Sequence, residues 1–286
     1  ISLELPLVVV DVQRGGPSTG LPTKTEQSDL LLAMYGRHGE APLPLVAAQS
    51  PSHCFDAAFE AVRIAVKYRT PVILLTDGYL ANGAEPWKLP DVDALPDISV
   101  PFATEPNHDG EFWPYLRDPK TLARPWAIPG TPGLMHRIGG LEKEDGSGNV
   151  NYDPLNHHHM VELRAQKVAG IAQDIPPVIV DDPDGASLLV LGWGSTWGAI
   201  QQAVREARAA GTPAAHAHLV HLNPFPSNLG EVLARYDGVL VPEMNLGQLT
   251  KLVRAEFLVD AKTLPKVQGL PFRAAEIVAA IEEMSR

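Results

Sequence analysis

Two short apolar runs, at 7–12 and 71–77, flank a segment in which apolar residues recur at helical spacing. Continuous runs rich in β-branched residues are typical of parallel strands that are covered on both faces. We therefore predict an internal parallel strand at 7–12, a buried strand at 71–77 and a short strand at 45–48. The helix before the last strand is predicted to begin after Ser52, a good N-cap residue, and to end near Arg69. Strand, helix and strand in this order form a βαβ unit, so the chain is expected to fold around a parallel sheet.

The C-terminal part of the chain returns to regular alternation of strands and helices. Strands are predicted at 187–191, 216–222 and 239–241, and helices are predicted to follow the turn at 192–196, Asn228 and Gly247. The predicted fold class is therefore α/β with parallel sheets.

Between 86 and 184 the periodicity fades and prolines recur, in a chain whose 27 prolines are about twice the usual ~5%. Such a stretch is too long for a simple loop in a compact domain. Aromatic residues gather between Phe102 and Trp126, whereas a disordered linker is normally poor in aromatics. We therefore interpret the segment as an irregular, Pro-rich connecting arm that lies on a partner, with one helix at about 156–172. The predicted domains are 1–85, 86–184 and 185–286.

Composition excludes several classes of protein. Lys and Arg number 23 and Asp and Glu 34, so the net charge of −11 disfavours binding to nucleic acid or an anionic membrane. No apolar run approaches the ~20 residues that cross a bilayer. Cys54 is the only cysteine, so this chain alone can build neither a disulfide framework nor a cysteine-ligated cluster, and scarce cysteine favours a cytoplasmic location. Because the chain lacks an initiator Met and enters its first strand at once, we expect a further segment upstream.

The densest chemical signal is the loop from Arg14 to Thr23, with the sequence RGGPSTGLPT, which follows the first predicted strand. Ligands of open α/β sheets bind at the carboxyl ends of the strands. Glycines allow close approach of the backbone, the Arg14 guanidinium suits a carboxylate or phosphate, and Ser18, Thr19 and Thr23 add hydroxyl groups. The loop therefore predicts an anion-binding site; the alternative is an ordinary Gly/Pro loop with a surface arginine.

Other candidates carry weaker signals. The run His157–His159 suggests a metal site, but adjacent helical residues point in different directions and metal ligands on a helix favour i, i+4 spacing. The turn at 192–196 could present a helix N-terminus to a phosphate, although it lacks the lysine of a P-loop and is better explained as a structural turn.

Cys54 lies at a predicted helix start, where a thiolate is favoured, but no partner base is evident. Asp11 and Asp77 are acids at strand ends, which could face a site or cap loops.

Taken together, these motifs resemble the alpha subunit of two-subunit 2-oxoacid:ferredoxin oxidoreductases, and most closely its 2-oxoglutarate-using members. The resemblance begins with Val10, Asp11, Val12 and Gln13 ahead of the loop, and it covers nearly the whole chain in order. Its further segments are Gln27 and Asp29, Gly39 and Glu40, Cys54 and Phe55, Asp77, and the stretches 223–226 (NPFP), 243–248 (EMNLGQ) and 269–272 (GLPF).

The resemblance implies the second half of a pyrimidine-type domain of thiamine enzymes, followed by the arm and a domain like the transketolase C-terminus. It implies that Arg14 and Thr23 hold the carboxylate of the 2-oxoacid, with Ser18 and Thr19 in the same substrate loop. Thiamine diphosphate with Mg²⁺ and a 4Fe-4S cluster are expected on a partner beta subunit. Coenzyme A would be the co-substrate and ferredoxin the electron acceptor. The expected assembly is an αβ dimer or a dimer of αβ pairs.

The implied activity is oxidative decarboxylation of 2-oxoglutarate to succinyl-CoA with reduction of ferredoxin, as in the tricarboxylic acid cycle. Two alternatives stay open from the residues alone. One is a non-catalytic α/β module that binds an anion or serves as a scaffold. The other is a transketolase-like half-chain.

Overall fold

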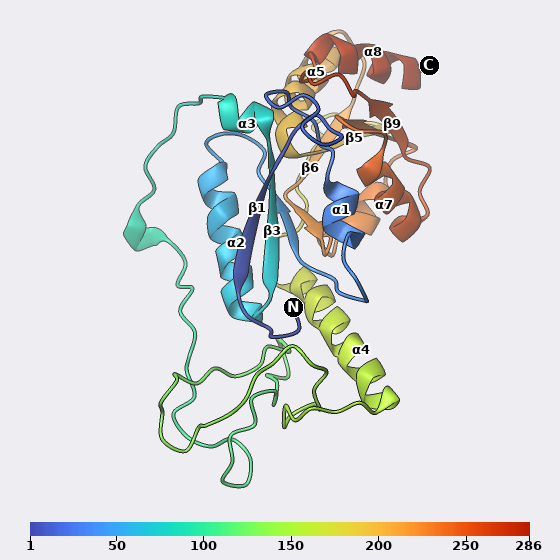
Figure 1. Cartoon of the computed structure of the whole chain (residues 1–286). Coiled ribbons are helices and arrows are strands. Elements are labelled where there is room, and N and C mark those ends of the chain that lie inside the picture. Colours follow the sequence, from blue (N-terminus) through green and yellow to red (C-terminus); the bar gives the residue numbers. More distant parts are fainter.

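The computed structural model describes residues 1–286 as two sheets with their helices and a long arm between them in sequence (Figure 1). The first sheet has the strand order β1-β3-β2-β7. Its strands are β1 (Leu7–Gln13), β2 (Leu45–Ala47), β3 (Pro71–Asp77) and β7 (His221–Asn223), with helices α1 (Leu30–Tyr35), α2 (Cys54–Tyr68) and α3 (Gly78–Asn82). The predicted strand–helix–strand unit is therefore confirmed as β2, α2 and β3.

Strand β1 lies at the edge of the first sheet, with β3 on one side and no strand on the other. It pairs in parallel with β3 from Leu7 opposite Pro71 to Gln13 opposite Asp77, which confirms the parallel pairing. The prediction that this strand is internal is wrong, because Val10 is 55% exposed. An apolar run indicates that the side chains of a strand favour burial. It does not show that other residues of the same chain bury them. An uncovered apolar edge of this kind is typical of a contact with another polypeptide segment.

The second sheet has the strand order β4-β6-β5-β8-β9. Its strands are β4 (Val180–Asp181), β5 (Leu188–Trp193), β6 (Ala215–Leu219), β8 (Gly238–Glu243) and β9 (Lys262–Pro265). Helices α5 (Trp197–Ala209) and α8 (Ala274–Met284) cover one face, and α6 (Leu229–Leu233) and α7 (Gln248–Phe257) cover the other. Alternate residues of β5 enter the two cores: Leu188 and Val190 pack with α5 and α8, whereas Leu189 and Leu191 pack with α6 and α7.

The strand predicted at 216–222 is divided between the two sheets. Its first part is β6, and its second part, β7, pairs antiparallel with β2 of the first sheet. β4 also pairs antiparallel with β6, so the expectation of purely parallel sheets is wrong at these two short edge strands. The largest core cluster joins Leu45 and Leu75 to Leu191 and Leu219, and so extends across both sheets. The division into 1–85, 86–184 and 185–286 stays a prediction.

Two predicted helix caps are wrong, although the helices themselves are confirmed. Helix α2 begins at Cys54 after His53, which makes no side-chain cap, and Ser52 instead donates its backbone N–H to Glu85. Asn228 precedes α6, but its side chain bonds both the N–H and the carbonyl of Val178. A cap residue has several possible partners, and here the tertiary contact replaces the local one.

The arm contains helix α4 (Pro154–Gly170), which confirms the helix predicted at about 156–172. Asp153 caps it by accepting from the N–H groups of Leu155 and Asn156. Short 3₁₀ turns lie at η1 (Val92–Ala94) and η2 (Ile171–Gln173). Figure 1 shows the arm descending beside α2 and then forming irregular loops near the end of the first sheet where β1 begins. No helix of the structure is both long and apolar enough to span a membrane.

A buried histidine makes fold stability depend on pH. His216 on β6 is 6% exposed, and burial lowers its pKa to about 4. The unfolded chain has the ordinary value of ~6.5 and binds the proton more readily, so stability is complete above that pH and falls between about 6.5 and 4. When the pH falls from 6.5 to 5, the unmodified protein should lose about 2 kcal/mol more unfolding free energy than the His216→Gln variant. Urea unfolding at several pH values measures this, with His158→Gln on the exposed face of α4 as control; parallel curves for all three proteins would contradict it.

Candidate functional site

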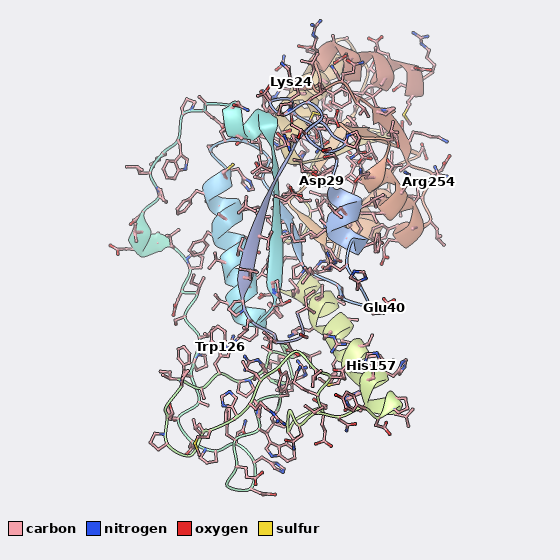
Figure 2. All side chains as sticks on the ribbon, viewed as in Figure 1. Lys24, Asp29, Glu40, Trp126, His157 and Arg254 are labelled. Carbon is pink, nitrogen blue, oxygen red and sulfur yellow. The ribbon has the colours of Figure 1, made fainter.

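The loop from Arg14 to Thr23 lies at the carboxyl end of β1, as the sequence predicts, and is closed at its base. Gly15 N donates to the carbonyl of Lys24 at 3.0 Å, and Leu21 N donates to the carbonyl of Gly15 at 2.8 Å. Gly20 has φ +41°, and a Cβ there would lie 2.4 Å from the Gly15 carbonyl oxygen, so only glycine fits. Figure 2 labels Lys24 at this end of the first sheet, close to the C-terminal helices.

All four predicted side chains are exposed on this loop. Arg14 Nη1 donates to the carbonyl of Thr19 at 3.3 Å and forms no ion pair with any carboxylate of the chain. The hydroxyl groups of Ser18, Thr19 and Thr23 make no hydrogen bond within the chain. The arrangement therefore offers a guanidinium and hydroxyl groups to a ligand, held by a backbone whose ends are fixed.

Gln27 joins the base of this loop to the second sheet. Its side chain is fully buried, with Nε2 donating to the carbonyl of Trp193 at 2.8 Å and Oε1 accepting from Met244 N at 2.9 Å. Its main chain bonds Met244 and the side chain of Asn245. The residues after the loop are thereby fixed against the carboxyl ends of β5 and β8.

The segment after β8, which Gln27 contacts, is held in place by its own hydrogen bonds. Glu243 is fully buried and accepts from the N–H groups of Leu249 and Thr250, so its carboxylate closes the N-terminus of α7. Gly247 has φ +81°, and a Cβ there would lie 2.5 Å from the Thr263 hydroxyl. Gln248 donates to the carbonyl of Ser28 at 2.8 Å, which ties the start of α7 to the same loop base.

A hollow of about 540 Å³ lies where β2, β3, β5 and β8 end. Ser195, Thr196 and Met244 line it from the second sheet, and Gln49 and Tyr79 line it from the first. Beside it, Asp77 caps α3 through bonds from Tyr79 N and Leu80 N. Burial raises the pKa of the Asp77 carboxyl against the opposing effect of the Ser195 and Thr25 hydroxyls. Asp77 is therefore a structural cap at the edge of the hollow.

The structure gives each histidine from His157 to His159 a separate acidic neighbour. His157 lies against Glu142, His158 lies 3.4 Å from Glu162, and His159 lies 3.0 Å from Asp145. No group of three or more His, Cys, Asp or Glu side chains is arranged to hold a metal ion. The three rings point to different carboxylates because adjacent helical residues diverge.

The remaining candidates are explained by local structure. The Cys54 thiol donates to the carbonyl of Ser50, and burial, with the charges of Asp77 and Glu85, raises its pKa, which disfavours a reactive thiolate. In the turn at 192–196, Gly194 has φ +58° and Thr196 donates to the carbonyl of Trp193 at 2.8 Å.

Removal of the Gln27 side-chain amide tests the joint between the loop and the second sheet. In the Gln27→Leu variant the buried Met244 N–H loses its partner, so we expect a loss of ~1–3 kcal/mol of unfolding free energy. The Trp193 carbonyl loses one donor but keeps the Thr196 hydroxyl. Gln202→Leu removes an exposed amide that bonds only Glu206 and should change stability by less than about 0.5 kcal/mol. Denaturant unfolding measures both, and equal stabilities would show that the joint contributes nothing.

Two family models match the chain. Residues 1–152 match the model described as pyruvate flavodoxin/ferredoxin oxidoreductase, thiamine diphosphate-binding, and residues 186–273 match pyruvate:ferredoxin oxidoreductase core domain II. The chain therefore belongs to the pyruvate and 2-oxoacid:ferredoxin oxidoreductase family, as an alpha subunit. This finding confirms the resemblance drawn from the sequence motifs and the α/β fold class.

Relatives refine the placement within the family. The chain is 60% identical over 279 residues to a Mycobacterium tuberculosis protein named 2-oxoglutarate oxidoreductase subunit KorA, covering 97% of this chain and 42% of the relative. It is 31% identical to the 2-oxoglutarate synthase subunit KorA of Methanothermobacter marburgensis, covering 98% of this chain and 74% of the relative. The chain spans less than half the length of the first of these relatives.

A solved structure shares the whole fold. It is the 2-oxoglutarate:ferredoxin oxidoreductase from Magnetococcus marinus, with 2-oxoglutarate, coenzyme A and succinyl-CoA bound. It superposes with a TM-score of 0.90 at 33% identity, over 100% of this chain and 50% of the other.

Proposed function

We propose that this chain forms part of the alpha subunit of a thiamine diphosphate-dependent enzyme that converts 2-oxoglutarate and coenzyme A to succinyl-CoA and CO₂. Two electrons pass to ferredoxin for each substrate oxidised. Support comes from the 60% identity to a 2-oxoglutarate oxidoreductase subunit and from the relative solved with 2-oxoglutarate bound. The one observation on this chain that carries the proposal is the loop at the carboxyl end of β1, with its unpaired Arg14 guanidinium.

The residues of the loop have distinct roles in this proposal. Arg14 holds a carboxylate of the 2-oxoacid through its planar guanidinium, and Thr23 donates a hydrogen bond to the same group. Ser18 and Thr19 supply further hydroxyl donors at the tip of the loop. Since the loop base is fixed by Gln27, the chain orients the substrate, which is an effect of position and entropy rather than of covalent chemistry.

The cofactors of the proposed reaction do not fit this chain alone. A 4Fe-4S cluster requires several thiolates, and Cys54 is the only cysteine. No set of three acidic, histidine or cysteine side chains is placed to hold the Mg²⁺ of thiamine diphosphate. We assign both groups to the beta subunit, where thiamine diphosphate would supply the electron sink for decarboxylation.

The assembly follows from the same proposal. The uncovered edge of β1 and the exposed apolar side chains of the arm are candidate contacts with the beta subunit and with the rest of the enzyme, in an αβ dimer or a dimer of αβ pairs. Ferredoxin would meet the beta subunit, which carries the cluster. We place the enzyme in the cytoplasm, in the tricarboxylic acid cycle.

Reconstitution with the beta subunit tests the proposal against the alternatives. We expect ferredoxin reduction that requires 2-oxoglutarate, coenzyme A and thiamine diphosphate together. Transfer of a two-carbon unit between sugar phosphates without ferredoxin would favour the transketolase-like reading. Normal assembly without any thiamine-dependent turnover would favour the non-catalytic module.

A further inference from the structure

A second charged hollow lies far from the Arg14 loop. It has a volume of about 1050 Å³ and is enclosed by the C-terminal end of α2, the turn η2 and the arm. Figure 2 labels Trp126, one of its lining residues, near the end of the first sheet opposite Lys24. The hollow is therefore separate from the proposed substrate loop.

Its lining is positively charged in an acidic protein. Three acidic residues, Asp97, Asp118 and Asp174, face six basic ones, which are Arg63, Lys67, Arg69, Arg117, Lys120 and Arg124. Asp174 pairs with Arg63 and Lys67, and Glu4 pairs with Arg117. Arg69 and Arg124 have no carboxylate partner.

These two unpaired guanidinium groups are deeply buried. Arg69 is 6% exposed and donates only to the carbonyls of Val66 and Lys67, while its Nε has no partner. Its guanidinium carbon lies 4.2 Å from the centre of the Trp126 ring. Arg124 is 3% exposed and donates only to the carbonyls of Leu3 and Pro125.

Burial lowers the pKa of Arg69, and the charge of Arg124 lowers it further. A buried cation is costly unless an anion compensates it, and here neither Arg69 nor Arg124 pairs directly with a carboxylate of the hollow. This cost points to a ligand that brings the missing negative charge.

We propose that this hollow binds a small multivalent oxyanion, the phosphate or carboxylate groups of a metabolite, between Arg69 and Arg124. The planar guanidinium groups match both kinds of oxyanion in a bidentate geometry. The site does not depend on the proposed catalytic function.

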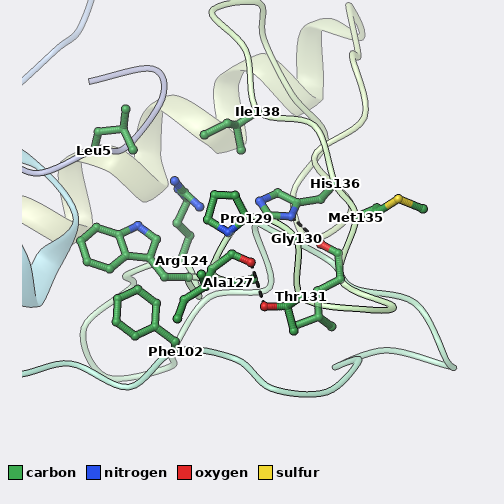
Figure 3. Close-up of a pocket in the computed structure, with 13 residues that line it drawn as sticks. Leu5, Phe102, Arg124, Ala127, Pro129, Gly130, Thr131, Met135, His136 and Ile138 are labelled. Atoms are coloured by element: carbon green, nitrogen blue, oxygen red, sulfur yellow. Dashed lines mark hydrogen bonds between the residues drawn. The ribbon is translucent and has the colours of Figure 1, made fainter.

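A neighbouring apolar hollow of about 760 Å³ shares Phe102, Arg124 and Trp126 with the charged one. Figure 3 shows Arg124 among the residues that line the apolar hollow, and the same residue also lines the charged one. The apolar body of a ligand has room in this second hollow while its anionic groups contact the arginines.

Calorimetric titration of the purified protein with inorganic pyrophosphate and, separately, with citrate at low ionic strength tests the site. We expect saturable binding of one probe or both, and the preferred probe distinguishes a phosphate from a carboxylate ligand. Arg69→Gln and Arg124→Gln should each weaken binding about tenfold or more, because each removes a charge-assisted contact. Arg208→Gln is the matched control, since Arg208 also donates to backbone carbonyls near a helix end but pairs with Asp181 at 2.9 Å.

Hydrogen exchange on the unmodified protein gives a second measurement that needs no variant. Bound pyrophosphate or citrate should slow exchange in peptides that contain Arg69 and Arg124 and leave the Arg14 loop unchanged. Absence of saturable binding by 10 mM probe, or equal binding by all variants, would overturn the proposal. Binding that disappears when the beta subunit is added would also overturn it, by assigning the hollow to an acidic segment of that subunit.

Discussion

Replacement of Glu4 by glutamine should lower the unfolding free energy by ~3–5 kcal/mol. Glu4 is 3% exposed and accepts from Arg117 in the arm and Lys167 on α4, including a bond of 2.7 Å from Arg117 Nη1. Burial opposes its ionisation, but the hydrogen bond from Arg117 and the charge of Lys167 hold its pKa below the usual range. Without this carboxylate, both buried cations keep their desolvation cost, Lys167 loses its counter-charge, and Arg117 keeps only Asp145 at 3.8 Å.

The same change should loosen the arm. Limited proteolysis should cleave Glu4→Gln faster between Pro101 and Pro132, because Glu4 connects the N-terminal segment to the arm through Arg117. Glu40→Gln removes an exposed carboxylate without a hydrogen-bond partner and serves as control. If Glu4→Gln unfolds within about 1 kcal/mol of the unmodified protein, the ion pairs do not hold the arm.

Replacement of Arg14 by alanine should reduce kcat/KM for 2-oxoglutarate in the assembled enzyme by roughly 30-fold to several-thousand-fold. This range corresponds to the ~2–5 kcal/mol lost when a charge pair is broken in a water-poor site. Arg14→Lys should rescue only part of the activity, because lysine provides a point charge without a fork. Thr23→Val should have a smaller effect, on the order of 1–3 kcal/mol for one lost donor.

These substitutions should leave folding and assembly intact, since Arg14 and Thr23 are exposed and bond no core residue. Steady-state kinetics with an artificial electron acceptor measures the effect. Arg254→Ala, which removes a surface ion pair with Asp260 on the second sheet's side, is the control. Near-normal efficiency of Arg14→Ala in a fully assembled enzyme would assign the loop to a structural or subunit contact.

Local sequence patterns predict most helices and strands of this chain, because helix and strand formation depends on side chains close in sequence. The apolar stripe before 71–77 became α2, and the runs at 187–191 and 239–241 became β5 and β8. Pattern alone does not reveal that β1 is an edge strand. The apolar side chains of Val10 and Val12 favour a covered strand, but in this structure they stay exposed at the edge of the sheet.

The contact of Gln27 with the second sheet cannot be predicted from residues close in sequence. Gln27 and Met244 are 217 positions apart, and nothing in either sequence neighbourhood signals the bond. In the sequence, Gln27 and the stretch 243–248 are points of family resemblance only, and the structure supplies their physical role. Likewise, the strand at 216–222 divides between two sheets because Val46 and Leu45 of β2 offer partners that the sequence does not mark.

A structure of the assembled enzyme with 2-oxoglutarate bound would show which residues hold the substrate. We expect the Arg14 guanidinium to lie within ~2.7–3.2 Å of a substrate carboxylate, with the Thr23 hydroxyl bonded to the same group. A substrate carboxylate held by other residues, with Arg14 turned to solvent or to the beta subunit, would contradict this expectation.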